Sequence, residues 1–137
     1  MIGVLVVLLV VTGGGVGAAA RWGIQEAWEL LNRERRIERG LRPAAIVPWP
    51  TMLANVLACF VLGLVIPQFG SPSTPGAQLG FSLFSTGFCG GMSTVSFLAL
   101  DTVRLLRRGA AVSAIGYLTL TCGLCMAAFW LGLVIVL

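Results

Sequence analysis

The chain has 137 residues, 58% of them hydrophobic, and its mean hydropathy is +0.98. Only 10% of its residues are charged, against about 25% in ordinary soluble domains, so the composition excludes a soluble protein and indicates one that is solvated by lipid. Nine Lys and Arg against five Asp and Glu give a net charge of +4, and there is no His.

Four apolar runs are long enough to cross a hydrocarbon core of about 30 Å, which takes roughly 20 helical residues. They cover residues 2–20, 51–69, 77–103 and 111–137. The alternating segments of about 10 residues that are typical of a membrane β-barrel are missing. We therefore predict an all-α membrane protein in which residues 1–137 form one domain of four transmembrane helices. The first run is not expected to be a signal peptide, because no positive charge precedes it.

A polar connection over residues 24–42 follows the first run. Several of its Glu and Arg residues are three or four positions apart, a spacing that supports a helix. We expect an exposed helical extension of the first transmembrane helix. The alternative is an amphipathic helix that rests on anionic headgroups.

The second run contains one strongly polar residue, Asn55, about a turn inside its start. Polar groups inside a membrane are costly and mark functional positions. Asn55 either makes an interhelical hydrogen bond, worth roughly 1 kcal/mol, or lines a pore as a donor. The sequence leaves both interpretations open.

The third run carries the segment "TGFCGGMSTVSF", residues 86–97. Each of its three glycines disfavours a helix by about 1 kcal/mol relative to Ala, and non-helical backbone at membrane depth survives only where it is buried in protein or lines a cavity. We predict a non-helical break over Gly87–Ser93 near mid-membrane, whose freed carbonyls suit a hard monovalent cation. The alternative is close helix packing through small residues, which we favour for Gly87 taken alone.

Hydroxyl side chains follow these glycines and recur in the fourth run. Donors without a fixed cation beside them suit a small anion that must be able to leave again, and the positive ring edges of Phe88 and Phe97 could add to such a lining. The alternative for the fourth run is that its hydroxyls bond back to their own helix. The candidates are Ser93, Thr94, Ser96, Ser113, Thr119 and Thr121.

Cysteines lie only within the predicted transmembrane helices, where a free thiol behaves as a small apolar group. Cys122 and Cys125 have the Cys-x-x-Cys spacing. Because the chain has no His and this pair lies in a membrane helix, we expect no metal or redox site there.

All nine basic residues are arginines, and all lie in two connections. The first connection contains Arg21, Arg33, Arg35, Arg36, Arg39 and Arg42, and the second contains Arg104, Arg107 and Arg108. With four transmembrane helices, both connections are on the same side. The positive-inside rule therefore predicts a multi-pass protein of the cell membrane with both termini outside.

Three segments resemble the Fluc (CrcB) family of fluoride channels, in order along nearly the whole chain. The first, "GGGVGAAARW", has Gly13, Gly14, Gly17, Ala18 and Arg21 in register with the family pattern. The second, "TMLANVLACFVLG", and the third, "GFCGGMSTVSF", continue the match. In the second segment the matched residues are Thr51, Asn55, Phe60 and Gly63.

The resemblance implies an antiparallel dimer with two fluoride pores and a structural sodium ion on the dimer axis. It places the sodium on the backbone carbonyls of Gly90 and Ser93 from both subunits. It implies that Arg21 is near a basic mouth and that Asp101 stands where the family often has Glu. The residues it assigns to the fluoride pore are Asn55, Ser93, Thr94, Ser96, Phe97 and Thr121.

The chain departs from the family pattern at several pore positions. Val95 and Leu98 stand where the family has two pore phenylalanines, and Phe97 replaces a threonine of the hydroxyl track. A hydroxyl position of the fourth helix falls at Cys125, although Thr121 keeps a polar group one turn earlier.

These observations lead to three hypotheses for function, none of which involves nucleic acid. The first is a channel subunit for passive export of fluoride, and the second is a non-conducting partner that completes the pore of a related subunit. The third, a small proton-coupled transporter, is weakened because no carboxylate lies deep in an apolar run, and this absence together with the lack of His argues against an enzyme. Because nine arginines against none orient nearly every copy one way, we predict a dimer with an oppositely oriented homologue.

Overall fold

The computed structural model describes residues 2–39, 48–70 and 74–137, and for residues 33–39 it gives the backbone helix only. In order along the chain, the elements are α1 (Ile2–Arg39), α2 (Trp49–Phe69), α3 (Pro75–Phe81), the π-helix η2 (Ser82–Cys89), α4 (Gly90–Met92), α5 (Val95–Arg107) and α6 (Ala111–Val136). These described ranges contain helices and no strands.

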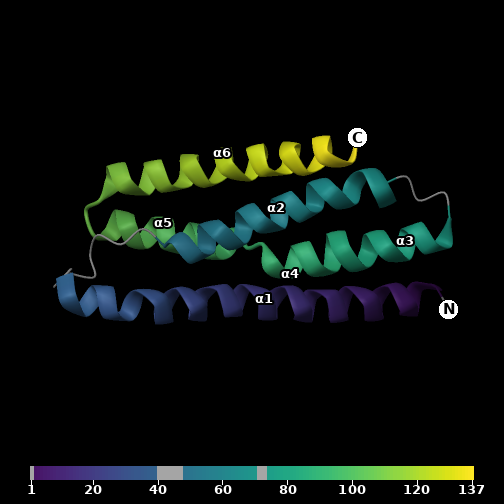
Figure 1. The fold of residues 1–137 in the computed structure, drawn as a ribbon, viewed down its shortest axis with the longest axis horizontal. Coiled ribbons are helices and arrows are strands. Elements are labelled where there is room, and N and C mark those ends of the chain that lie inside the picture. Colours follow the sequence, from purple (N-terminus) through teal and green to yellow (C-terminus); the bar gives the residue numbers. More distant parts are fainter. Residues whose placement is uncertain (1, 40–47, 71–73) are drawn as a thin grey trace.

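Among the described residues, four helical stretches are long and apolar enough to cross a membrane, which confirms the predicted all-α membrane class. They are Ile2–Asn32, Trp49–Phe69, Pro75–Arg107 and Ala111–Val136. The stretches lie side by side, and successive ones run in opposite directions (Figure 1). Both chain termini therefore lie at one end of the bundle, and the α5–α6 turn lies at the other.

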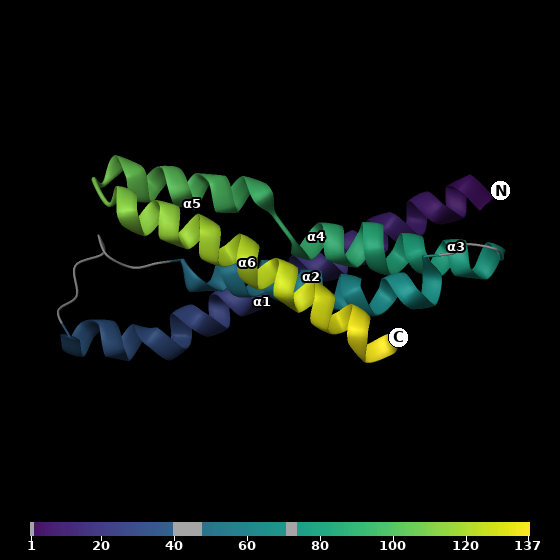
Figure 2. The same cartoon turned by 90° about the horizontal axis from the view of Figure 1, so that it is seen from above.

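Helix α1 continues without interruption through the predicted polar connection as far as Arg39. The extension of the first transmembrane helix is thus helical up to that residue, and residues 40–42 of the predicted connection lie outside the described residues. Figure 2 shows the end of α1 and α5 on opposite sides of the bundle, at the end away from the termini.

Two close helix pairs hold the bundle together, α2 with α6 and α1 with η2 and α4. Glycines allow the backbones to touch in both pairs. A Cβ atom on Gly63 would overlap the carbonyl oxygen of Phe129, and a Cβ on Gly17 would overlap that of Phe88. The close approach gains dispersion contacts that larger residues would prevent.

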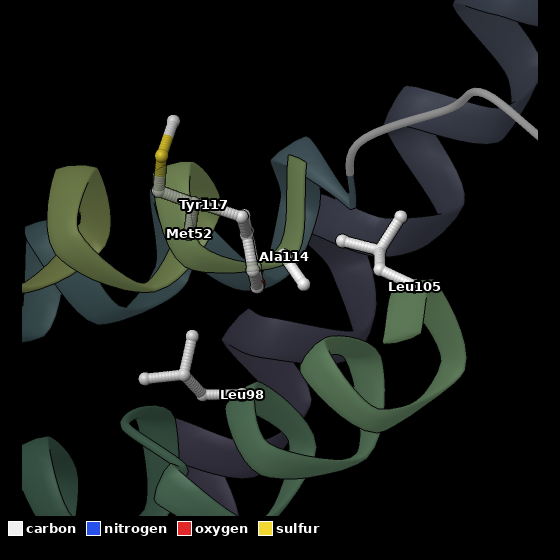
Figure 3. Packing of buried hydrophobic residues seen from close by; sticks show 5 residues of the cluster. All are labelled: Met52, Leu98, Leu105, Ala114 and Tyr117. Atoms are coloured by element: carbon white, nitrogen blue, oxygen red, sulfur yellow. The ribbon is translucent and has the colours of Figure 1, made fainter. Parts of the chain in front are cut away.

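A small apolar core joins α2, α5 and α6 (Figure 3). It consists of Met52, Leu98, Leu105, Ala114 and Tyr117, with Val56 packed against it. The tight turn between α5 and α6 uses Gly109, whose φ of +75° is a conformation that side chains disfavour.

The predicted non-helical segment Gly87–Ser93 is helical from Gly87 to Met92, so that prediction is wrong over these residues. The glycines serve close packing instead, because a Cβ on Gly91 would overlap the carbonyl oxygen of Gly14. Between η2 and α5, only Ser93 and Thr94 have extended backbone, with ψ values of 145° and 110°. The third membrane-spanning stretch is therefore interrupted between α4 and α5, at the C-terminal end of the predicted segment.

Candidate functional site

The interruption at Ser93 and Thr94 is bound by a side chain from another helix. The carboxamide oxygen of Asn55, on α2, accepts a 2.7 Å hydrogen bond from the N–H of Thr94. The amide nitrogen of Asn55 donates a 3.5 Å bond to the carbonyl oxygen of Thr94. Asn55 is buried at 5% exposure, so it provides partners where water cannot, and this is the interhelical interpretation of Asn55.

This arrangement changes the bonding of the Gly90 carbonyl. In a continuous α-helix the N–H of Thr94 would donate to the carbonyl oxygen of Gly90, four residues earlier. Here that N–H donates to Asn55. Gly90 is exposed, and a Cβ atom on it would meet nothing within 4 Å, so the backbone is open to an approaching group at this point.

The carbonyl of Ser93 is affected in the same way. Its donor in a continuous helix would be the N–H of Phe97. That N–H donates to the hydroxyl of Thr94 at 3.3 Å, so that Thr94 caps the start of α5. The interruption thus removes the regular helical donors of two carbonyls, those of Gly90 and Ser93, which are the two that the family resemblance assigns to a cation.

The predicted hydroxyl donors have different surroundings. Ser93 and Thr94 are partly buried, while Ser96 is exposed on the first turn of α5. Thr121, on α6, is 1% exposed and donates to the carbonyl oxygen of Tyr117 at 2.7 Å. Thr121 therefore bonds back to its own helix, the alternative that the sequence left open.

Asp101 lies inside the bundle, at 8% exposure. One carboxylate oxygen accepts a 3.0 Å hydrogen bond from the Thr51 hydroxyl, and the other forms a 3.4 Å ion pair with Arg104. A buried carboxylate requires such partners. The sequence analysis missed the pairing with Thr51, since the two residues are 50 positions apart, although an acid in an apolar helix signals that a donor must lie nearby.

Tyr117 lies in the core beside this part of α2 (Figure 3). It is 2% exposed, and its hydroxyl makes no hydrogen bond to the described residues. Buried hydroxyls are usually bonded, so this group is an exception among the described residues.

Arg21 and Phe97 meet across the interruption. The guanidinium carbon of Arg21 lies 5.1 Å from the centroid of the Phe97 ring, a cation–π contact. Arg21 is partly exposed, and Phe97 is 40% exposed. The sequence predicted both residues for a site but gave no sign that they touch.

The two positions at which the family resemblance expects pore phenylalanines differ in their exposure. Val95 is 76% exposed, whereas Leu98 is 9% exposed and belongs to the core. The two side chains therefore point to different environments within this chain. Within the described part of the chain, no group of three or more His, Cys, Asp or Glu side chains is arranged to hold a metal ion.

Comparison with known proteins gives a match over nearly the whole chain. The family model "CrcB-like protein, Camphor Resistance (CrcB)" matches residues 8–133. A protein of Rhizobium etli named fluoride-specific ion channel FluC is 36% identical over 128 residues, which are 93% of each chain. A protein of Rhodococcus jostii named fluoride-specific ion channel FluC 2 is 35% identical and is matched over 96% of its length.

Proposed function

The chain belongs to the CrcB family, and from this membership we propose that it is a subunit of a fluoride-selective channel that exports fluoride passively and lowers its cytoplasmic concentration. The relatives at about 35% identity are named as fluoride-specific ion channels and not as enzymes. The four helices that can span a membrane suit such a role.

The hydrogen bonds around Ser93 and Thr94 give the strongest structural support for the proposal. Asn55 and the Thr94 hydroxyl take the N–H groups that a helix would direct at Gly90 and Ser93. Carbonyl oxygens without helical donors are ligands for a hard monovalent cation. We propose that these two carbonyls, with those of a partner subunit, hold a structural sodium ion, which would supply a fixed positive charge at the dimer axis.

The proposed fluoride path uses the polar side chains around this interruption. Ser96 and Phe97 lie exposed on the first turn of α5, where a second subunit could complete a passage. Ser93 and Thr94 lie at the interruption itself, and Asn55 and Thr121 lie inside the subunit. Asn55 and Thr121 already bond to backbone groups. We therefore propose that they stabilise the helices that line the path and also make it polar.

The proposed partner is a homologue inserted in the opposite direction. The arginines Arg104, Arg107 and Arg108 lie at the end of α5, away from the two termini (Figure 1). By the positive-inside rule this end faces the cytoplasm and the termini face outside. The exposed Val95 leaves room for an aromatic side chain from the partner, in an antiparallel dimer within the lipid bilayer.

A second candidate is a non-conducting partner subunit. It is favoured by Val95 and Leu98, because neither supplies the aromatic ring that the family resemblance expects. In this case the homologue carries the competent pore, and this chain completes the dimer.

Fluoride efflux from liposomes tests these proposals. The chain is reconstituted alone and together with a homologue from the same organism, and termini are mapped with membrane-impermeant labels. Efflux from the chain alone supports the exporter, and efflux only from the pair supports the partner role. No efflux from either preparation would overturn the channel proposal, and equal labelling of termini on both faces would overturn the single orientation.

A further inference from the structure

Helix α1 contacts the chain on both sides of the interruption at Ser93 and Thr94. Before the interruption, Gly14 and Gly17 bring the α1 backbone against Gly91 and Phe88. After it, the guanidinium of Arg21 lies over the ring of Phe97 in the first turn of α5. Arg21 is one helical turn beyond Gly17, so the same face of α1 makes all three contacts.

The contact between Arg21 and Phe97 joins α1 and α5, two helices that pack mainly against other elements. Helix α5 packs mainly on α6, through Leu98 and Leu105 in the shared core. Helix α1 packs mainly on η2 and α4. The Arg21–Phe97 contact therefore connects the half of the bundle that precedes the interruption with the half that follows it.

We propose that Arg21 is a positioning residue: its cation–π contact with Phe97 ties the first turn of α5 to α1 and so sets how α4 and α5 meet across the interruption. Together with Asn55, which binds Thr94 from α2, it holds the interruption from two sides. The inference rests on the proposed channel function for its effect on flux, whereas the contact itself does not depend on that function.

The chemistry of the pair explains why this chain carries an arginine opposite a phenylalanine. A guanidinium is planar and stacks flat on an aromatic face, and a lysine ammonium does not. The cation is attracted by the negative face of the ring, and the ring edge that remains is positive. The contact thus fixes the direction in which the edge of Phe97 points, as well as the position of α5.

The competing explanation is that Arg21 is a positive charge that attracts anions at the entrance of the pore. This explanation and the positioning role predict different effects of substitution. If Arg21 only attracts anions, Arg21→Lys keeps the function, and any effect of Phe97→Leu, a residue of the proposed fluoride path, is independent of Arg21 and adds to that of Arg21→Met. If Arg21 positions α5, then Arg21→Met and Phe97→Leu lower fluoride efflux alike, by about two- to fivefold for a partly exposed contact. Arg21→Lys, which keeps the charge but not the planar guanidinium, lowers efflux by less. The double variant Arg21→Met/Phe97→Leu then loses no more than either single variant.

The decisive experiment replaces Phe97 by phenylalanines that carry one, two or three ring fluorines, because these change the ring charge with little change of size. We expect stepwise loss of both thermal stability in detergent and maximal efflux, with the half-saturating fluoride concentration unchanged. The series must flatten in the Arg21→Met background. Arg107→Met, exposed at the end of α5, is the matched control and should leave both readouts unaltered.

Each outcome decides the inference separately from the channel proposal. A stability loss that is graded in wild-type protein and absent in Arg21→Met supports the contact even if no preparation conducts fluoride. Additive effects of the two substitutions, or full activity of Arg21→Lys, would overturn the positioning role while leaving the channel proposal intact.

Discussion

Asn55 on α2 binds both backbone groups of Thr94, a residue 39 positions later in the chain. The bond from the Thr94 N–H replaces the partner that a continuous helix would provide for that group. The Thr94 carbonyl oxygen also accepts a 3.4 Å bond from the N–H of Leu98. An interruption of a helix inside an apolar bundle is costly when its backbone groups remain unpaired. Asn55 therefore determines whether the interruption at Ser93 and Thr94 is stable.

We predict that Asn55→Leu destabilises the protein by about 1–3 kcal/mol, because it leaves the partly buried N–H of Thr94 without its partner. Fluoride efflux should be lost along with the stability. Thermal unfolding in detergent and liposome efflux measure the two effects. Leu53→Ala, at an exposed position of the same helix, is the control and should change stability by no more than about 0.5 kcal/mol. Wild-type stability and efflux in Asn55→Leu would contradict the assignment.

The hydrogen bond between Thr51 and Asp101 predicts a coupled pair. Thr51→Val removes the 3.0 Å bond to the buried carboxylate and should cost about 1.5–3 kcal/mol, the range for hydrogen bonds to charged groups. In an Asp101→Asn background the same substitution should cost less. A double-mutant cycle from thermal unfolding measures the coupling, and an additive cycle would show that the two side chains do not interact in solution.

The surroundings of the glycines predict that Gly→Ala lowers the stability of the protein at some positions and raises it at others. Gly63→Ala and Gly17→Ala introduce a methyl group where a backbone carbonyl already lies, so the helices must move apart and stability falls. Gly116→Ala and Gly123→Ala meet nothing within 4 Å, and the better helix propensity of Ala should raise stability by up to about 1 kcal/mol. Unfolding temperatures of the four variants check the prediction, which fails if the two pairs respond alike.

The surroundings of the Tyr117 hydroxyl predict that the protein keeps its stability when this hydroxyl is removed. Because this buried hydroxyl makes no hydrogen bond to the described residues, Tyr117→Phe removes a group that is desolvated without compensation. Stability should stay the same or rise by about 1 kcal/mol. Tyr117→Leu leaves a cavity in the core and should lower it by several kcal/mol, on the order of other large-to-small core changes. A clear loss in Tyr117→Phe would mean that the hydroxyl has a partner.

The sequence by itself was sufficient for the class of fold and the family. Apolar runs of roughly 20 residues match the thickness of a bilayer, and the backbone in lipid must bond within its own helix, so composition and length alone predict four transmembrane helices. The Glu and Arg spacing of the first connection likewise predicts its helix, since neighbours on one helix face are local in sequence. Three segments in order along the chain were together enough to indicate the family, because in the first of them the glycines and Arg21 occur at fixed spacings and the other two continue the match.

The place of the interruption was decided by the tertiary structure. The low helix propensity of glycine predicts a break over Gly87–Met92. These residues remain helical because α1 lies against Gly87 and Gly91, and the close packing there stabilises the helix. The helix is interrupted at Ser93 and Thr94, where Asn55 replaces a lost backbone partner. The contact of Arg21 with Phe97 depends in the same way on two helices that are adjacent only in the folded chain. Local propensity is a property of a segment, whereas the partner of a backbone group or an aromatic ring is a property of whatever the fold places beside it.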